Sequence, residues 1–304
     1  MLLYARYRRA RQSAEREWGD LNQARLIFGE RVGHVSVRFL VDYYPLDERF
    51  GTEPGVSYLV STDRHRVLFD LGLNPRRRSP SALESNLATL GLDSTPVDGV
   101  FISHNHADHV GGLRCQLEKS PALQQACGMA ACEVPVWTCF PACAPHSVEV
   151  DEPRELLPGM ASTGPLPAPL YVLGLTHEHA LLVAVGDRGL VLISGCGHPG
   201  VVEMARFAES VTGERVFAVV GGLHLITQGR RTRVQKYLGT NRPFWASPSR
   251  SDVRREIERL RWLGVETLAP SAHDSCDASL RIMREVFGDG YLPLRAGGEV
   301  RFEA

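Results

Sequence analysis

The sequence predicts a layered α/β fold with helices outside two sheets. Strand-like runs rich in β-branched and aromatic residues are mixed with helix-like segments along the whole chain. Hydrophobic residues form 43% of the 304 residues, which supports a sizeable core, and the charged share of 23% is ordinary for a soluble enzyme. No apolar run approaches the roughly 18 to 20 residues that a membrane helix needs.

The first 27 residues predict an amphipathic helix, with buried positions at Leu3, Tyr7, Trp18, Leu21 and Leu26. The basic start lacks the apolar core of a signal peptide, so a cytoplasmic protein is expected. We interpret residues 1–34 as a helical extension and residues 35–304 as the main domain. The helix is expected to pack on that domain, or on a second subunit of a homo-oligomer, rather than on a membrane surface.

The remaining elements follow from residue periodicity and from glycine and proline breaks. Strands are predicted at residues 35–43, 57–62, 66–70, 97–102, 170–173, 180–185, 189–193, 215–220, 265–269 and 299–302. Helices are predicted at residues 81–91, 111–120, 201–211, 251–264 and 277–287. Residues 121–168 are rich in Pro, Ala and Cys and are interpreted as an insertion or lid. Residues 227–250, which include Tyr237, Phe244 and Trp245, are predicted to cap the pocket and to be mobile without ligand.

The most informative stretch, SHNHADH at residues 103–109, comes directly after a predicted strand and before a Gly-Gly pair. Neutral imidazole is a good ligand for zinc, iron and manganese, and aspartate supplies a hard oxygen. His104 and His106 are two residues apart, so an extended turn can point both the same way. Asp108 and His109 are adjacent and diverge, which suits a second ion.

Further candidate ligands follow later predicted strands. Cys196 is interpreted as a ligand or as a small buried residue, and His198 as a metal or substrate contact. His224 follows two glycines and is either a substrate contact or a packed histidine. His273 is predicted to be the last ligand of the second metal. Asp70 is predicted to orient the metal loop through hydrogen bonds.

The seven cysteines are odd in number and irregularly spaced, which argues against a disulfide framework. A structural zinc site made by Cys127, Cys132, Cys139 and Cys143 is the weaker interpretation, because no pair has CxxC spacing. Buried free thiols in a reducing compartment are the better one.

The loop resembles the HxHxDH signature of the metallo-β-lactamase fold, and other motifs extend the likeness over roughly residues 35 to 303. They are Val41-Asp42-Tyr43, Leu68-Phe69-Asp70-Leu71-Gly72, residues 103–113, residues 163–167, Glu178-His179-Ala180-Leu181, residues 194–200, residues 220–225 and residues 270–275. In this order they resemble the branch of 7,8-dihydropterin-6-yl-methyl-4-(β-D-ribofuranosyl)aminobenzene-5′-phosphate synthases. The resemblance implies an αββα sandwich of two mixed sheets.

The resemblance also implies one or two divalent metal ions, zinc in first place, with iron and manganese as alternatives. His104, His106 and a later residue would hold the first ion, with His177 or His179 as candidate third imidazole. Asp108, His109 and His273 would hold the second. Cys196 stands where the fold usually has a bridging aspartate. Glu178 and His179 replace the branch's usual Glu-Gln and are interpreted, with His224, as substrate-binding residues.

Three functions remain open for this sequence. The first is a metal-dependent hydrolase of a small phosphorylated or ester-type metabolite, with Asp108 holding or deprotonating the attacking water. The second is transfer of a dihydropterin from its diphosphate, and the third is a metal-binding relative without catalysis. The arginines at residues 76–78 and 230–231 are phosphate-binding candidates or solvated surface. The net charge of −1 and the lack of a long basic stretch argue against nucleic acid, so a small molecule is the expected partner.

Overall fold

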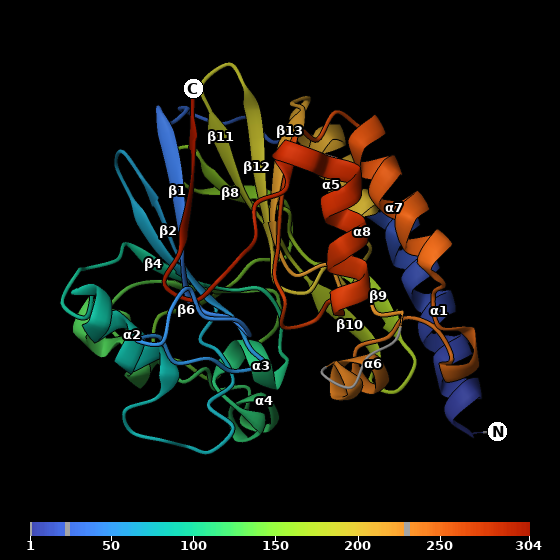
Figure 1. Cartoon of the computed structure of the whole chain (residues 1–304), viewed down its shortest axis with the longest axis horizontal. Coiled ribbons are helices and arrows are strands. Elements are labelled where there is room, and N and C mark those ends of the chain that lie inside the picture. The colour runs from blue at the N-terminus through green and yellow to red at the C-terminus, as the bar shows by residue number, and fades with distance from the viewer. Residues whose placement is uncertain (1, 22–24, 228–231) are drawn as a thin grey trace.

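The computed structural model describes residues 2–21, 25–227 and 232–304, and its elements form two sheets with helices outside them (Figure 1). The first sheet has the strand order β15-β1-β2-β3-β4-β5-β6, and the second has the order β14-β13-β12-β11-β8-β7. A separate two-stranded sheet pairs β10 with β9. The predicted αββα sandwich is therefore confirmed.

The strands of the first sheet are β1 (His34–Val41), β2 (Ser57–Thr62), β3 (Arg66–Phe69), β4 (Gly99–Ile102), β5 (Val136–Thr138), β6 (Ser147–Glu149) and β15 (Glu299–Glu303). Those of the second are β7 (Arg154–Leu157), β8 (Met160–Ser162), β11 (Leu181–Val185), β12 (Gly189–Ser194), β13 (Val216–Gly221) and β14 (Thr267–Pro270). The small sheet consists of β9 (Leu166–Leu170) and β10 (Gly174–Glu178).

The longer helices are α1 (Leu2–Asp20), α2 (Ala82–Leu90), α5 (Val201–Thr212), α7 (Arg250–Trp262) and α8 (Asp277–Phe287). Short ones are α3 (Ala107–Val110), α4 (Leu113–Glu118), α6 (Arg233–Leu238) and the 3₁₀ turns η1 (Leu123–Met129), η2 (Phe244–Ala246) and η3 (Gly288–Gly290). In the described part of the chain, none of the helices combines the length and the apolar character that a bilayer crossing requires.

Three hydrophobic clusters explain the layers. Alternate residues of a strand point to opposite faces, so neighbours in β11 belong to different clusters. Val183 packs between the two sheets, whereas Leu182 packs under α5, α7 and α8. Leu68 of the first sheet packs under α2 and η1. Strands buried on both faces, such as β12 and β13, therefore appear in the sequence as continuous apolar runs.

Several sequence predictions were wrong in detail. Residues 121–168 are not a lid, because they supply β5 and β6 to the first sheet and β7 and β8 to the second. Of the strand predicted at residues 170–173, only Leu170 lies in a strand, at the end of β9, and residues 171–173 form the turn between β9 and β10. Leu3 is 37% exposed rather than buried. Cys127 and Cys132 form a disulfide and so are not free thiols.

Candidate metal centre

The candidate site lies where strands of both sheets end. The loop at residues 103–109 follows β4, the turn at 195–198 follows β12, and residues 271–274 follow β14. Because β12, β13 and β14 run parallel, their carboxyl ends meet at one edge of the second sheet. Gly195 allows the two sheets' loops to meet, since a Cβ there would lie 2.1 Å from Ser103 Oγ.

Three histidines, His104, His106 and His198, form the first group of potential ligands. His106 Nδ1 lies 3.0 Å from His104 Nε2 and 3.2 Å from His198 Nε2. With zinc–nitrogen distances near 2.0–2.1 Å, tetrahedral geometry separates two ligand nitrogens by about 3.3 Å. The nitrogens therefore already have nearly the spacing of ligands around one ion.

These three imidazoles are also in the protonation state that a ligand needs. Burial lowers the pKa of His104 and of His198 well below the usual value, and it lowers the pKa of His106 to about 3. Neutral rings that converge in this way present lone pairs toward a shared point. The first group fits a divalent cation.

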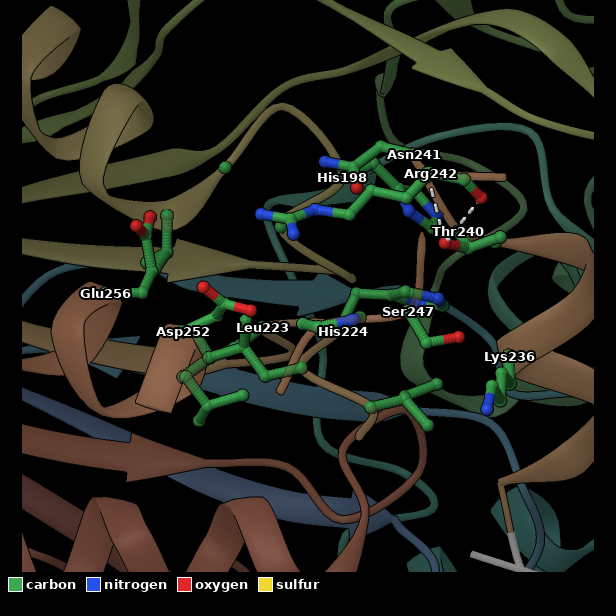
Figure 2. Close-up of a pocket in the computed structure, with 18 residues that line it drawn as sticks. His198, Leu223, His224, Lys236, Thr240, Asn241, Arg242, Ser247, Asp252 and Glu256 are labelled. Carbon is green, nitrogen blue, oxygen red and sulfur yellow. Dashed lines mark hydrogen bonds between the residues drawn. The ribbon is translucent and has the colours of Figure 1, made fainter. Parts of the chain in front are cut away.

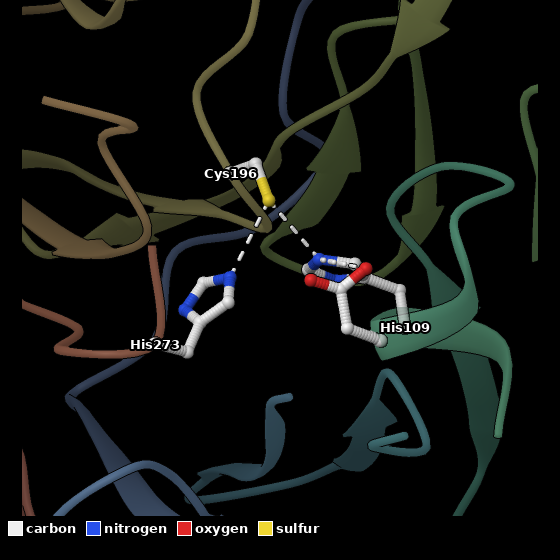
Figure 3. A group of neighbouring side chains, drawn as sticks. His109, Cys196 and His273 are labelled. Carbon is white, nitrogen blue, oxygen red and sulfur yellow. Dashed lines mark hydrogen bonds and ion pairs between the residues drawn. The ribbon is translucent and has the colours of Figure 1, made fainter. Parts of the chain in front are cut away.

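The second group is Asp108, His109, Cys196 and His273, whose ligand atoms lie within 4.8 Å of one another. Figure 3 shows Cys196 between the two histidines, with its Sγ 3.1 Å from His109 Nε2 and 3.4 Å from His273 Nε2. Asp108 Oδ1 lies 3.8 Å from His109 Nε2. Cys196 thus belongs to the cluster that the sequence suggested for the second ion.

Asp70 orients one histidine of each group, His109 directly and His104 through Ser103. His109 Nδ1 donates to Asp70 Oδ2 over 2.6 Å, and Ser103 Oγ donates to the same oxygen over 2.7 Å. His104 Nδ1 lies 3.0 Å from Ser103 Oγ, so its proton is held there and Nε2 is left as the ligand atom. Burial lowers the pKa of His109, but the carboxylates of Asp70 and Asp108 outweigh it and raise that pKa to about 9. Asp70 has the orienting contacts expected of it.

A second, parallel arrangement orients His273. Ser271 Oγ donates to Asp42 Oδ2 over 2.5 Å, and His273 Nδ1 lies 2.7 Å from Ser271 Oγ. In both arrangements a buried aspartate accepts a hydrogen bond from a serine beside the ligand histidine: Asp70 from Ser103, and Asp42 from Ser271. Sequence reasoning missed Ser103, Ser271 and Asp42 as site residues. The available signal was a serine one or two residues before a candidate ligand histidine.

Glu178 does not face a substrate, contrary to the sequence interpretation. Its fully buried carboxylate accepts hydrogen bonds from the backbone N–H groups of the turn that carries Cys196 and His198. The four distances, to the nitrogens of Gly195, Cys196, Gly197 and His198, are 3.0, 2.9, 2.9 and 2.8 Å. Burial nevertheless raises the pKa of this carboxyl. Glu178 fixes the shape of the ligand turn.

His179 and His177 do not supply the third imidazole either. His179 is fully buried, with Nε2 2.8 Å from the Ile102 carbonyl and Nδ1 2.8 Å from Ser162 Oγ. Both of its nitrogens are therefore engaged with groups of the protein itself. His177 Nε2 pairs with Glu17 of α1 over 2.7 Å. His198 takes the place that the sequence assigned to one of these two.

His198 and His224 lie at the wall of a cavity of about 150 Å³ (Figure 2). Residues 236–248 also line it, with Lys236, Thr240, Asn241, Arg242 and Ser247. Burial lowers the pKa of His224 to about 4, and its Nε2 donates to the Gln235 carbonyl over 3.2 Å. The predicted cap therefore lines the pocket, while its mobility remains a prediction.

The arginine candidates divide into two cases. Arg76 and Arg78 line a different cavity, together with Glu53 and Asn74. Arg230 and Arg231 lie outside the described residues.

Comparisons with known proteins agree with this geometry. A family model described as the metallo-beta-lactamase superfamily matches residues 50–124, which include the histidine loop. A crystal structure of a metal-dependent hydrolase of the beta-lactamase superfamily superposes with a TM-score of 0.62 at 21% identity, covering 89% of this chain and 100% of that one. This chain is a metallo-β-lactamase-fold protein.

Two further relatives extend the likeness. A 7,8-dihydropterin-6-methyl-4-(beta-D-ribofuranosyl)-aminobenzene-5'-phosphate synthase of Methanocaldococcus jannaschii is 24% identical over 314 residues, covering 90% of this chain and 98% of its own length. The metallo-beta-lactamase fold protein YhfI from Bacillus subtilis has a TM-score of 0.54 at 14% identity, covering 89% of this chain and 100% of that one. The branch resemblance seen in the motifs thus extends over nearly the whole synthase.

Proposed function

We propose that this metallo-β-lactamase-fold protein is a metal-dependent hydrolase of a small phosphorylated or ester-type metabolite. The proposal rests on the two ligand groups, one of three imidazoles and one of Asp, His, Cys and His. His198 of the first group lines a cavity that Lys236 and Arg242 also line. Divalent ions there would supply Lewis acidity and a water of lowered pKa. Zinc is the first candidate, with iron and manganese as alternatives.

The chain's own residues would bind and orient the substrate. Lys236 and Arg242 would attract an anionic group toward the wall that His198 and His224 form. Asp108 is the acid of the centre whose side chain retains some exposure, at 20%, so it can accept a proton from an attacking water. Asp70 and Glu178, which are fully buried, would hold the loops rather than exchange protons with substrate.

The test measures turnover together with metal content. Metal-loaded protein is assayed with p-nitrophenyl phosphate, bis(p-nitrophenyl) phosphate and p-nitrophenyl acetate, beside Asp108→Asn with its metal content measured. Loss of a general base typically lowers kcat by about 10²- to 10⁴-fold. No turnover of any of these substrates by protein with full metal content would contradict the hydrolase.

A second candidate, transfer of a dihydropterin from its diphosphate, is supported by a separate observation. His106 lines another cavity, of about 260 Å³, with Asn105, Phe140 and His177, whereas His198 lines the first. His198 Nε2 lies 3.2 Å from His106 Nδ1, so two substrates could reach the same centre through separate cavities. The name of the Methanocaldococcus relative points the same way.

Oxygen labelling separates the two candidates. In ¹⁸O water, hydrolysis of dihydropterin diphosphate puts the label into the released alcohol or phosphate. Transfer to a ribosylaminobenzene phosphate gives an unlabelled coupled product. A coupled product that forms only when both substrates are present would contradict the hydrolase and support the transferase.

A further inference from the structure

Residues 232–248, here called the cap segment, contact the site histidines directly. A Cβ on Gly239 would lie 2.3 Å from His224 Cε1 and 3.0 Å from His198 Cε1, so the backbone of the cap rests on both rings. Gln235 of the same segment accepts the hydrogen bond from His224. The position of the cap segment therefore determines the shape of the pocket.

The cap segment has little internal structure to fix that position. Its helix α6 contains 6 residues and has no side-chain hydrogen bond at its N-terminal cap. A helix this short is not stable without packing against other elements. Its aromatic side chains are also largely outside the core, with Trp245 at 71% exposed. Something outside the segment has to hold it.

The N-terminal helix α1 supplies that support, and its first turn reaches the cap segment where Tyr4 packs against Trp245, with ring centroids 6.0 Å apart. Tyr7 is 7% exposed, and its hydroxyl donates to the Asn241 carbonyl over 2.8 Å. The Tyr7 ring packs edge-on against Tyr171, with centroids 5.3 Å apart. Tyr171 in turn donates its backbone N–H to the Thr240 carbonyl over 2.8 Å and packs against Phe244. Both routes end on residues of the cap segment.

Helix α1 is itself anchored to the main domain. Trp18 Nε1 donates to the Pro167 carbonyl over 3.0 Å, and the Trp18 ring packs edge-on against Phe207 of α5. Ala10 and Ala14 are buried on the same helix. Arg6 donates to the Leu173 carbonyl over 3.0 Å, in the turn between β9 and β10. A displacement of the cap therefore has to break contacts with a fixed helix.

We propose that Tyr7 is a positioning residue, through which helix α1 holds the cap segment over the pocket for an anionic small molecule. Lys236, Asn241 and Arg242 would then meet the ligand only while α1 is docked. The assignment of an anionic ligand rests on the proposed function, whereas the coupling between α1 and the cap does not.

The first measurement is hydrogen exchange of the full chain without ligand, comparing Tyr7→Phe with wild type. Phenylalanine keeps the ring and removes only the hydroxyl, and a hydrogen bond contributes about 0.5–1.5 kcal/mol, or about 2- to 10-fold in a local opening equilibrium. We expect exchange to accelerate by that factor at Gly239 and Tyr171, with β12 and β13 unchanged. Tyr4→Phe is the matched control, since it removes a hydroxyl from a half-exposed ring of the same helix and keeps the contact of that ring with Trp245. Equal exchange in Tyr7→Phe and wild type would overturn the proposal, and so would equal acceleration by Tyr4→Phe.

The second measurement asks whether the coupling reaches the pocket. Inorganic pyrophosphate added to metal-loaded wild type should slow exchange in α1 as well as in the cap segment, because coupling between two sites is reciprocal. With p-nitrophenyl phosphate, Tyr7→Phe should raise KM by about 2- to 10-fold and leave kcat and metal content unchanged. A fall in kcat with unchanged KM would overturn the positioning role. If no substrate turns over, the hydrolase proposal fails, and the exchange measurement still decides the coupling.

Discussion

Replacing Ser271 with alanine tests whether the two ligand groups are oriented separately. The hydroxyl accepts from His273 Nδ1 over 2.7 Å and donates to Asp42 Oδ2 over 2.5 Å. Its removal deletes both bonds, together with the bond that Ser271 Oγ accepts from the His273 backbone N–H over 3.2 Å, at a fully buried position. His273 belongs to the second ligand group, whereas the rings of His104, His106 and His198 lie within hydrogen-bonding distance of Ser103 and of one another. The variant should therefore weaken one ion and leave the other in place.

The magnitude follows from the buried hydrogen bonds. Depriving a buried polar group of its partner costs about 1–3 kcal/mol. The hydrogen bonds from the Tyr43 and Ala272 N–H groups to Asp42 Oδ1 remain, so the cost is shared between Asp42 Oδ2 and the orientation of His273. Each 1.4 kcal/mol is tenfold in affinity, which gives a loss of about 5- to 150-fold for the ion held there. Residues that orient metal ligands typically contribute 10- to 100-fold, in the same range.

The assay is a competition titration of zinc against a chromophoric chelator, which resolves two ions of different affinity. Ser162→Ala is the matched control, because Ser162 is also fully buried and lies 2.8 Å from a histidine nitrogen, that of His179, outside both groups. Ser271→Thr should restore the affinity, since the hydroxyl is retained. Equal losses for both ions, or an equal loss in Ser162→Ala, would refute the separate orientation of the second group.

Three more outcomes are expected. Glu178→Gln should lower the free energy of unfolding by about 2–4 kcal/mol in urea titrations, because four backbone N–H groups lose a charged acceptor and an amide nitrogen cannot accept the His198 N–H. Glu209→Gln, where the carboxylate accepts from one backbone N–H, should cost less than half of that. Burial lowers the pKa of His179 to about 3, so the neutral ring stabilises the fold fully above the unfolded pKa of about 6.5, and this stability is lost as pH falls. In metal-free wild type the free energy of unfolding should drop by about 2 kcal/mol from pH 6.5 to 5, and His179→Gln should lack this drop. The same pH dependence in His179→Gln as in wild type would contradict the interpretation. Cobalt-loaded Cys196→Ser should lose the absorption of a thiolate ligand and keep the ion of the imidazole group, whereas an unchanged spectrum would exclude Cys196 as a ligand.

The ligand candidates could be predicted because each stands directly after a strand. His104, Cys196 and His273 are local signals in the sequence, and the carboxyl ends of β12 and β14 meet through the parallel pairing of both with β13. Asp70 was predictable on the same basis, at the end of β3. The layers followed from strands buried on both faces, which appear as unbroken apolar runs.

The contacts that orient the ligands could not be predicted, since they depend on register between distant strands. Asp42 and Ser271 are separated by 229 positions, and nothing local links them. The small sheet was missed for a different reason. β9 contains Pro167 and Pro169, which count against a strand in a sequence pattern but are tolerated in a two-stranded sheet that has only edges.

The charges around Cys196 distinguish the second ligand group from the first. Burial raises the pKa of the Cys196 thiol and of the Asp274, Glu178 and Asp70 carboxyls. The carboxylates of Asp70, Asp108 and Glu178 outweigh the effect of burial on His109 and raise its pKa to about 9. Without a metal, these carboxylates therefore favour an imidazolium at a ligand position. A divalent ion would replace that proton, allow the thiol to ionise and offset the buried carboxylates together. The first group has no such excess of acid, because its imidazoles are neutral. The two groups would therefore bind an ion differently. The first would bind it through the lone pairs of neutral imidazoles, whereas at the second the charge of the ion would also offset the buried acidic groups.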